Sequence, residues 1–126
     1  MLKRVLIVED NVDNMELCTL ILKGKFELLT AYNGEEALEN IYNESPDLVL
    51  LDISLPDMDG LDIVKKIRKD EKLHALPFVA LTAHGMKGDR ERALSAGCDE
   101  YIEKPFEIKE LVRVINEQLQ KEPELF

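Results

Sequence analysis

The chain has 126 residues, enough for a single domain (residues 1–126) that can bury a core without disulfides. Its 26 acidic and 16 basic residues give a net charge of −10, which opposes binding to nucleic acid or to an anionic membrane. Because the sequence has no signal peptide, no membrane-spanning apolar run and only two widely separated cysteines, we expect a cytoplasmic protein with reduced cysteines.

Apolar runs and helical patterns alternate along the first part of the chain. The run at residues 5–8 ends in Glu9-Asp10, and apolar residues at helical spacing follow over residues 15–22. Residues 26–31 are typical of a second strand, and the Asn33-Gly34-Glu35-Glu36 segment supplies a cap and acidic residues for a second helix. This pattern predicts two strand–helix units.

The third run, Leu48-Val49-Leu50-Leu51-Asp52, is apolar at every position until its final carboxylate. A strand without alternation is covered on both faces, as in a parallel sheet that lies between helices. A loop that contains Pro56 and Gly60 then leads to a third helix, whose apolar residues are Leu61, Val64 and Ile67. Asp52 therefore ends a buried strand at the carboxyl edge of the sheet, where open α/β sheets bind their ligands.

The same alternation continues to the end of the chain. Residues 78–81 form a fourth run that ends in Thr82, and a polar helix follows over about residues 87–96 and stops at Gly97. Residues 101–103 form a short fifth strand, and Lys104-Pro105 follows it. The last helix carries the apolar residues Ile108, Leu111, Val112, Ile115 and Leu119. This pattern predicts an α/β fold, a five-stranded parallel doubly wound sheet with five helices, for which 2-1-3-4-5 is a common strand order.

Polar residues at the strand ends come together in that order. They are Glu9 and Asp10, Asp52, Thr82 and Lys104. Three carboxylates this close resist ionisation unless a cation compensates them, and oxygen ligands favour Mg²⁺, or alternatively Mn²⁺. Lys104 and Thr82 add a cation and a hydroxyl group that suit a bound anion. The sequence therefore predicts Mg²⁺-dependent phosphorylation of Asp52, with Lys104 and Thr82 binding the phosphoryl oxygens.

Four segments carry a resemblance to a known family across essentially the whole chain. They are residues 5–11, residues 47–60 with Leu55-Pro56-Asp57-Met58-Asp59-Gly60, Leu81-Thr82-Ala83, and Lys104-Pro105-Phe106. In order and spacing these segments resemble the receiver domain of two-component response regulators. The resemblance implies a flavodoxin-like (CheY-like) fold and supports the strand order 2-1-3-4-5.

The resemblance also implies how the site works. Asp52 would accept a phosphoryl group from a sensor histidine kinase or a histidine phosphotransfer protein, in a two-component or phosphorelay pathway. The protein would thus be a phospho-acceptor signalling domain rather than an enzyme. Glu9, Asp10 and the backbone carbonyl of Ser54 would hold the metal with Asp52, and the Lys104-Pro105 peptide bond would be cis.

Partner binding follows from the same resemblance. Tyr101 would move inward when Thr82 turns to the phosphoryl group, and this would change the face formed by the fourth helix, fifth strand and fifth helix. A downstream protein would bind that face. We expect Asn14, Leu17 and Phe106 to meet the phosphodonor, and we expect neither nucleic acid nor membrane as a partner.

Other functions remain open at this point. A phosphatase of the haloacid dehalogenase type also forms an aspartyl phosphate, but it needs a second Asp two residues after its nucleophile, where this chain has Ser54. A flavin carrier of the flavodoxin type needs a phosphate-binding loop after the first strand, where Glu9-Asp10 would repel phosphate. A protein-interaction module that is never phosphorylated is the third alternative.

Overall fold

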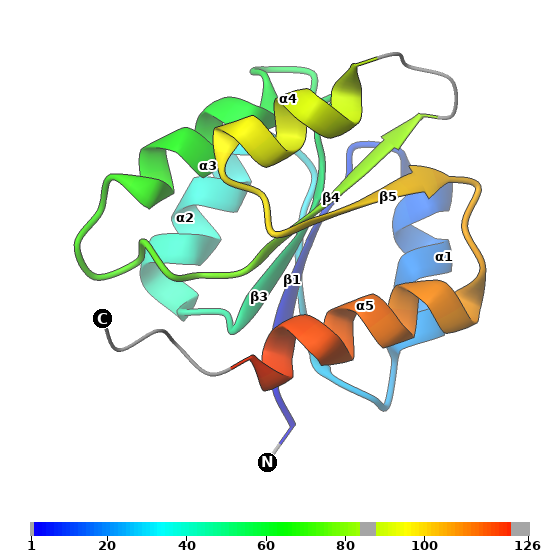
Figure 1. Cartoon of the computed structure of the whole chain (residues 1–126). Coiled ribbons are helices and arrows are strands. Elements are labelled where there is room, and N and C mark those ends of the chain that lie inside the picture. Colours follow the sequence, from blue (N-terminus) through cyan, green and yellow to red (C-terminus); the bar gives the residue numbers. More distant parts are fainter. Residues whose placement is uncertain (1, 84–87, 122–126) are drawn as a thin grey trace.

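The fold is known from a computed structural model that describes residues 2–83 and 88–121 (Figure 1). Its centre is one five-stranded parallel sheet in the order β2-β1-β3-β4-β5, as predicted. The strands are β1 (Arg4–Val8), β2 (Glu27–Ala31), β3 (Leu48–Asp52), β4 (Phe78–Ala83) and β5 (Glu100–Lys104). The end of β1 thus lies beside the end of β3, which places Glu9 near Asp52.

A helix follows each strand. The helices are α1 (Val12–Leu22), α2 (Gly34–Glu44), α3 (Gly60–Arg68), α4 (Asp89–Ala96) and α5 (Ile108–Gln120). The predicted start of the fourth helix at residue 87 lies outside the described residues. Among the helices that the structure describes, none combines the length and apolar character needed to cross a membrane.

Two apolar clusters cover the two faces of the sheet. Figure 1 shows α2, α3 and α4 on one face of the sheet and α1 and α5 on the other. Alternate residues of β1, β3 and β4 pack in the cluster of the first face, and the intervening residues pack in the cluster of the second. All five residues of β3 are buried, because helices cover both of its faces. The two cysteines are free and buried, Cys18 in α1 and Cys98 after α4, as the sequence predicted.

Short polar side chains start three of the helices. Asn11 accepts a hydrogen bond from the Asn14 amide at 2.9 Å, Asn33 accepts one from the Glu36 amide at 2.9 Å, and Asp59 accepts one from the Leu61 amide at 2.9 Å. These caps fix where α1, α2 and α3 begin. As a result, the three loops that lead into these helices have a defined length.

One predicted core residue is exposed. Ile108 was expected in the apolar stripe of the last helix, but 58% of its surface is accessible, whereas Leu111 and Ile115 are fully buried. Ile108 is the first residue of α5, and this first turn lies beside the carboxyl edge, where the strands end. Gln118 is buried in the same helix, which the apolar pattern did not predict.

Candidate functional site

The predicted polar residues meet at the carboxyl edge of the sheet. Asp52 is the last residue of β3, Glu9 and Asp10 follow β1, Thr82 lies in β4 and Lys104 ends β5. One carboxylate oxygen from each of Glu9, Asp10 and Asp52 lies within 4.8 Å of the others. Glu9 and Asp52 are only 1% and 6% exposed, whereas Asp10 is exposed to solvent. The site is therefore a buried pair of carboxylates with a third at its mouth.

Lys104 holds the two buried carboxylates. Its Nζ atom donates to Glu9 Oε1 at 2.8 Å and to Asp52 Oδ2 at 2.9 Å. The other oxygen of Asp52, Oδ1, accepts the backbone N–H of Ser54 at 2.9 Å. Both Asp52 oxygens thus have donors, which orients this carboxylate and stabilises its charged form.

The two buried carboxyl groups have opposite pKa shifts. Burial, together with the neighbouring Asp52 carboxyl group, raises the pKa of Glu9 to about 7, and the contact with Lys104 only partly opposes this. Burial also acts to raise the pKa of Asp52, but the interactions with Glu9, Lys104 and the Ser54 amide outweigh it and lower that pKa. Hydrogen bonds to both carboxylates likewise raise the pKa of Lys104 against the effect of its burial. When a proton is present, it therefore lies on Glu9 and leaves Asp52 ionised.

The site fits a divalent cation. Glu9 Oε2 is buried and has no hydrogen-bond partner among the described residues, and the Glu9 carboxylate contributes an oxygen to the cluster with Asp10 and Asp52. A buried oxygen without a donor is costly, and a hard cation would satisfy it. Since the three ligands offer only oxygen, the donor set favours Mg²⁺ or Mn²⁺ over zinc.

Thr82 makes a contact that the sequence did not reveal. Its hydroxyl donates to Asp89 Oδ2 at 2.8 Å, and both side chains are buried. Tyr101, in the neighbouring strand, is partly exposed and packs against the core. Burial raises the pKa of its phenol, and hydrogen bonding with Thr82 opposes the shift.

Sequence reasoning missed Asp89, because it described the fourth helix only as polar. The sequence does show a carboxylate in the first turn of that helix. It does not show that this carboxylate is buried, because its burial depends on how α4 packs on the sheet.

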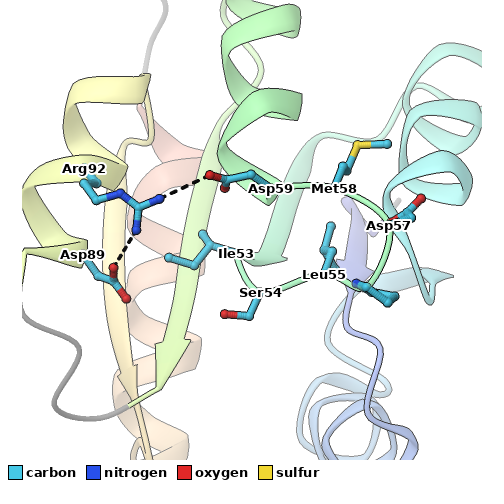
Figure 2. Close-up of a pocket in the computed structure, with 9 residues that line it drawn as sticks. Ile53, Ser54, Leu55, Asp57, Met58, Asp59, Asp89 and Arg92 are labelled. Atoms are coloured by element: carbon cyan, nitrogen blue, oxygen red, sulfur yellow. Dashed lines mark hydrogen bonds and ion pairs between the residues drawn. The ribbon is translucent and has the colours of Figure 1, made fainter.

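A shallow polar pocket lies between the β3–α3 loop and α4. Its volume is about 480 Å³, and Figure 2 shows Arg92 lying between two carboxylates at one side of it. Arg92 donates to Asp89 Oδ1 at 2.9 Å and to Asp59 Oδ2 at 3.2 Å. On the opposite side of the loop, Asp57 accepts hydrogen bonds from the amides of Gly34 and Glu35 at the start of α2. The loop that begins at Ser54 is thus held by α2 on one side and by α4 on the other.

A second cavity, which we name the donor groove, lies between α1 and the β5–α5 loop. It measures about 430 Å³ and is lined by Glu9, Asn14, Leu17, Cys18, Lys104, Pro105 and Phe106. Three of these residues, Asn14, Leu17 and Phe106, are those that the sequence linked to the phosphodonor. The peptide bond between Lys104 and Pro105 is cis.

Comparison with known proteins agrees with this architecture. The sequence model of the family described as "Response regulator receiver domain" matches residues 5–116. The polar-differentiation response regulator DivK of Brucella ovis is 42% identical over 120 residues, which cover 94% of this chain and 98% of that protein.

Solved structures are similar over nearly the whole chain. One is the receiver domain of the sensor histidine kinase PA1611 from Pseudomonas aeruginosa, with a magnesium ion coordinated in the active site cleft. It has 31% identity and a TM-score of 0.88, and the match covers 96% of this chain and 100% of that chain. A CheY-like receiver domain protein from Methanospirillum hungatei has 33% identity and a TM-score of 0.85, with 94% of each chain covered. The chain therefore belongs to the receiver domain family of response regulators, the signalling domains of two-component systems.

Proposed function

We propose that residues 1–126 act as one receiver domain in which Asp52 is the phosphoryl acceptor. The observation that carries this proposal is the position of Asp52 at the end of a buried strand, with Lys104 Nζ at 2.9 Å and the Ser54 amide at 2.9 Å. Because these donors keep Asp52 ionised, it is the nucleophile of the cluster, whereas Glu9 has the raised pKa.

The reaction follows from these contacts. An oxygen of Asp52 attacks the phosphorus of a phosphohistidine, the phosphorus–nitrogen bond breaks, and its electron pair returns to the imidazole nitrogen, which takes up a proton from solvent. Lys104 moves from Asp52 Oδ2 to a phosphoryl oxygen and balances the charge that develops there. The hydroxyl of Thr82 donates to another phosphoryl oxygen.

Glu9, Asp10, Asp52 and the backbone carbonyl of Ser54 would hold Mg²⁺, or alternatively Mn²⁺. When bound, the ion would neutralise the carboxylates and the charge on the phosphoryl oxygens. The unpartnered Glu9 Oε2 and the three converging carboxylates support this assignment. Asp10 is the exposed member of the set, so it marks the side from which the ion enters.

The donor groove is the proposed contact with the phosphodonor, a sensor histidine kinase or a histidine phosphotransfer protein. Leu17, which is 50% exposed, and Lys104 both line this groove. A histidine-bearing helix that covers this groove would bring its phosphoryl group to Asp52 and exclude water from the reaction. Output would follow at the face made of α4, β5 and α5, where Tyr101 responds to Thr82 and a downstream protein binds.

Phosphorylation by acetyl phosphate tests this proposal without any partner protein. We expect the intact mass of the wild type to rise by one phosphoryl group when Mg²⁺ is present, and to stay unchanged when the ion is chelated. The Asp52→Asn variant should show no gain under either condition. If the folded wild type binds Mg²⁺ yet gains no mass, the domain is an interaction module that does not use this chemistry.

A further inference from the structure

Asp89 is a buried carboxylate outside the predicted site. It is only 4% exposed, and its two oxygens have different partners: Oδ2 accepts the Thr82 hydroxyl at 2.8 Å and Oδ1 accepts Arg92 at 2.9 Å. A buried charge is tolerated only when it is compensated in this way. Arg92 supplies the countercharge from the surface, while Thr82 supplies a donor from the sheet.

The Thr82 hydroxyl has a single proton to donate. In the structure it donates that proton to Asp89, whereas the phosphorylated state that we propose needs the same proton for a phosphoryl oxygen. The two acceptors therefore compete. Because Asp89 is charged, its hydrogen bond with Thr82 is stronger than one between neutral groups, so it favours the resting orientation of the hydroxyl.

Arg92 sets how strongly Asp89 holds Thr82. The guanidinium group divides its donors between Asp89 and Asp59, and Figure 2 shows it lying between the two carboxylates. The Arg92 and Asp59 side chains are 55% and 43% exposed, so this second ion pair is readily exchanged with water. Without Arg92, Thr82 would be the only side chain among the described residues that donates to Asp89.

We propose that Asp89 is a positioning residue for the switch. It retains the Thr82 hydroxyl in the resting orientation, and Arg92 weakens this hold by sharing the charge of Asp89. This proposal rests on the proposed function, because it assumes that the phosphoryl group needs Thr82. It predicts opposite effects for the loss of Asp89 and the loss of Arg92, which general damage to α4 would not produce.

Beryllofluoride, BeF₃⁻, tests the competition because it binds a carboxylate oxygen as a stable mimic of the phosphoryl group. Its affinity is measured by ¹⁹F NMR in the presence of Mg²⁺. Asp89→Ala should tighten binding by about tenfold, the worth of one hydrogen bond to a charged group. Asp89→Asn keeps an uncharged acceptor and should give a smaller gain. Arg92→Gln should weaken binding.

A double-mutant cycle separates competition from structural damage. In a Thr82→Ala background, neither Asp89→Ala nor Arg92→Gln should change the affinity for BeF₃⁻. The matched control is Asp62→Ala, which removes an exposed carboxylate from the first turn of α3 and should have no effect. The proposal is overturned if Asp89→Ala leaves affinity unchanged or weaker, or if its gain persists without Thr82. If the wild type itself fails to bind BeF₃⁻ at Asp52, the proposed function fails instead.

Discussion

At the scale of single residues, the site depends on an imbalance of charge. Glu9, Asp10 and Asp52 face one lysine, and the two buried carboxylates share that lysine through bonds of 2.8 and 2.9 Å. Burial and the neighbouring Asp52 raise the pKa of Glu9 to about 7, which is well above 4.5. Without a metal ion, the folded protein therefore carries an unfavourable charge at Glu9 when the pH is high.

This charge predicts how stability depends on pH. Because folding raises the pKa of Glu9, its contribution to stability is fully present below about 4.5 and is lost as the pH rises through about 7. In a chelator, Glu9→Gln should therefore be more stable than the wild type at pH 8, by about 1–3 kcal/mol, and the two should converge near pH 5. Urea unfolding at several pH values measures this difference.

Two controls accompany that measurement. Glu16→Gln removes an exposed carboxylate from α1 and should show no such dependence on pH. Saturating Mg²⁺ should reverse the order at pH 8, because Glu9→Gln loses a proposed metal ligand. A stability difference that stays constant between pH 5 and pH 8 would mean that Glu9 does not titrate in this range.

At the scale of elements, the close contact between the end of β3 and the start of α3 positions Asp52. Gly60 is the first residue of α3, and a Cβ atom there would lie 2.8 Å from the Ile53 Cα and 3.0 Å from the Asp52 carbonyl oxygen. These neighbours are backbone atoms, so they cannot turn aside as a side chain can. The glycine therefore allows α3 to begin directly against the strand that carries the acceptor.

Gly60→Ala should separate these two elements. We expect a loss of about 1–3 kcal/mol in the free energy of unfolding and slower phosphorylation by acetyl phosphate, because the end of β3 is displaced. Gly34→Ala is the matched control, since its added Cβ would meet only the flexible side chain of Met58. Chemical denaturation and initial phosphorylation rates measure both effects. Equal losses for the two variants would contradict this explanation.

The strand–helix alternation could be predicted because most strands are contiguous apolar runs followed by a polar residue. Glu9 and Asp52 were placed at strand ends in this way, whereas Lys104 ends a short fifth strand that is only partly apolar. The contact between Thr82 and Asp89 could not be predicted, because it depends on where α4 packs relative to β4. Ile108 has the spacing of a core residue, but sequence periodicity does not show where the sheet that it would cover ends.

At the scale of the whole molecule, the surfaces that we propose for input and for output lie in different places. The donor groove lies between α1 and the β5–α5 loop, while Tyr101 lies in β5 and packs against the apolar cluster on the other face of the sheet. Figure 1 shows α2, α3 and α4 covering that other face. Asp52 and Thr82 lie between them in the sheet. A substitution at one surface should therefore leave the function of the other surface intact.

Leu17→Ala tests the input surface. It should slow phosphoryl transfer from a labelled histidine phosphotransfer domain that phosphorylates the wild type, by about tenfold, because an exposed apolar contact is lost. Phosphorylation by acetyl phosphate should be unchanged. Leu20→Ala, an exposed leucine of the same helix that does not line the groove, is the control. An equal effect of Leu17→Ala on both donors would assign it a structural role.

Tyr101→Ala tests the output surface. Phosphorylation of Asp52 should proceed as in the wild type, because Tyr101 does not contact the carboxylate cluster through any described hydrogen bond. The change in amide hydrogen exchange that BeF₃⁻ produces in α4 and β5 should become smaller, since the aromatic ring that links Thr82 to that face is gone. Tyr42→Ala, on α2, serves as the control. An unchanged exchange response would remove Tyr101 from the switch.

The most direct test of the central claim is the location of the phosphoryl group. After reaction with acetyl phosphate and Mg²⁺, borohydride reduction converts an aspartyl phosphate into homoserine, and peptide mass spectrometry then identifies the residue. If Asp52 is the acceptor, homoserine should form at position 52 and nowhere else, and none should form when Mg²⁺ is chelated. Modification at Glu9, Asp10 or Thr82, or at position 52 without Mg²⁺, would contradict it.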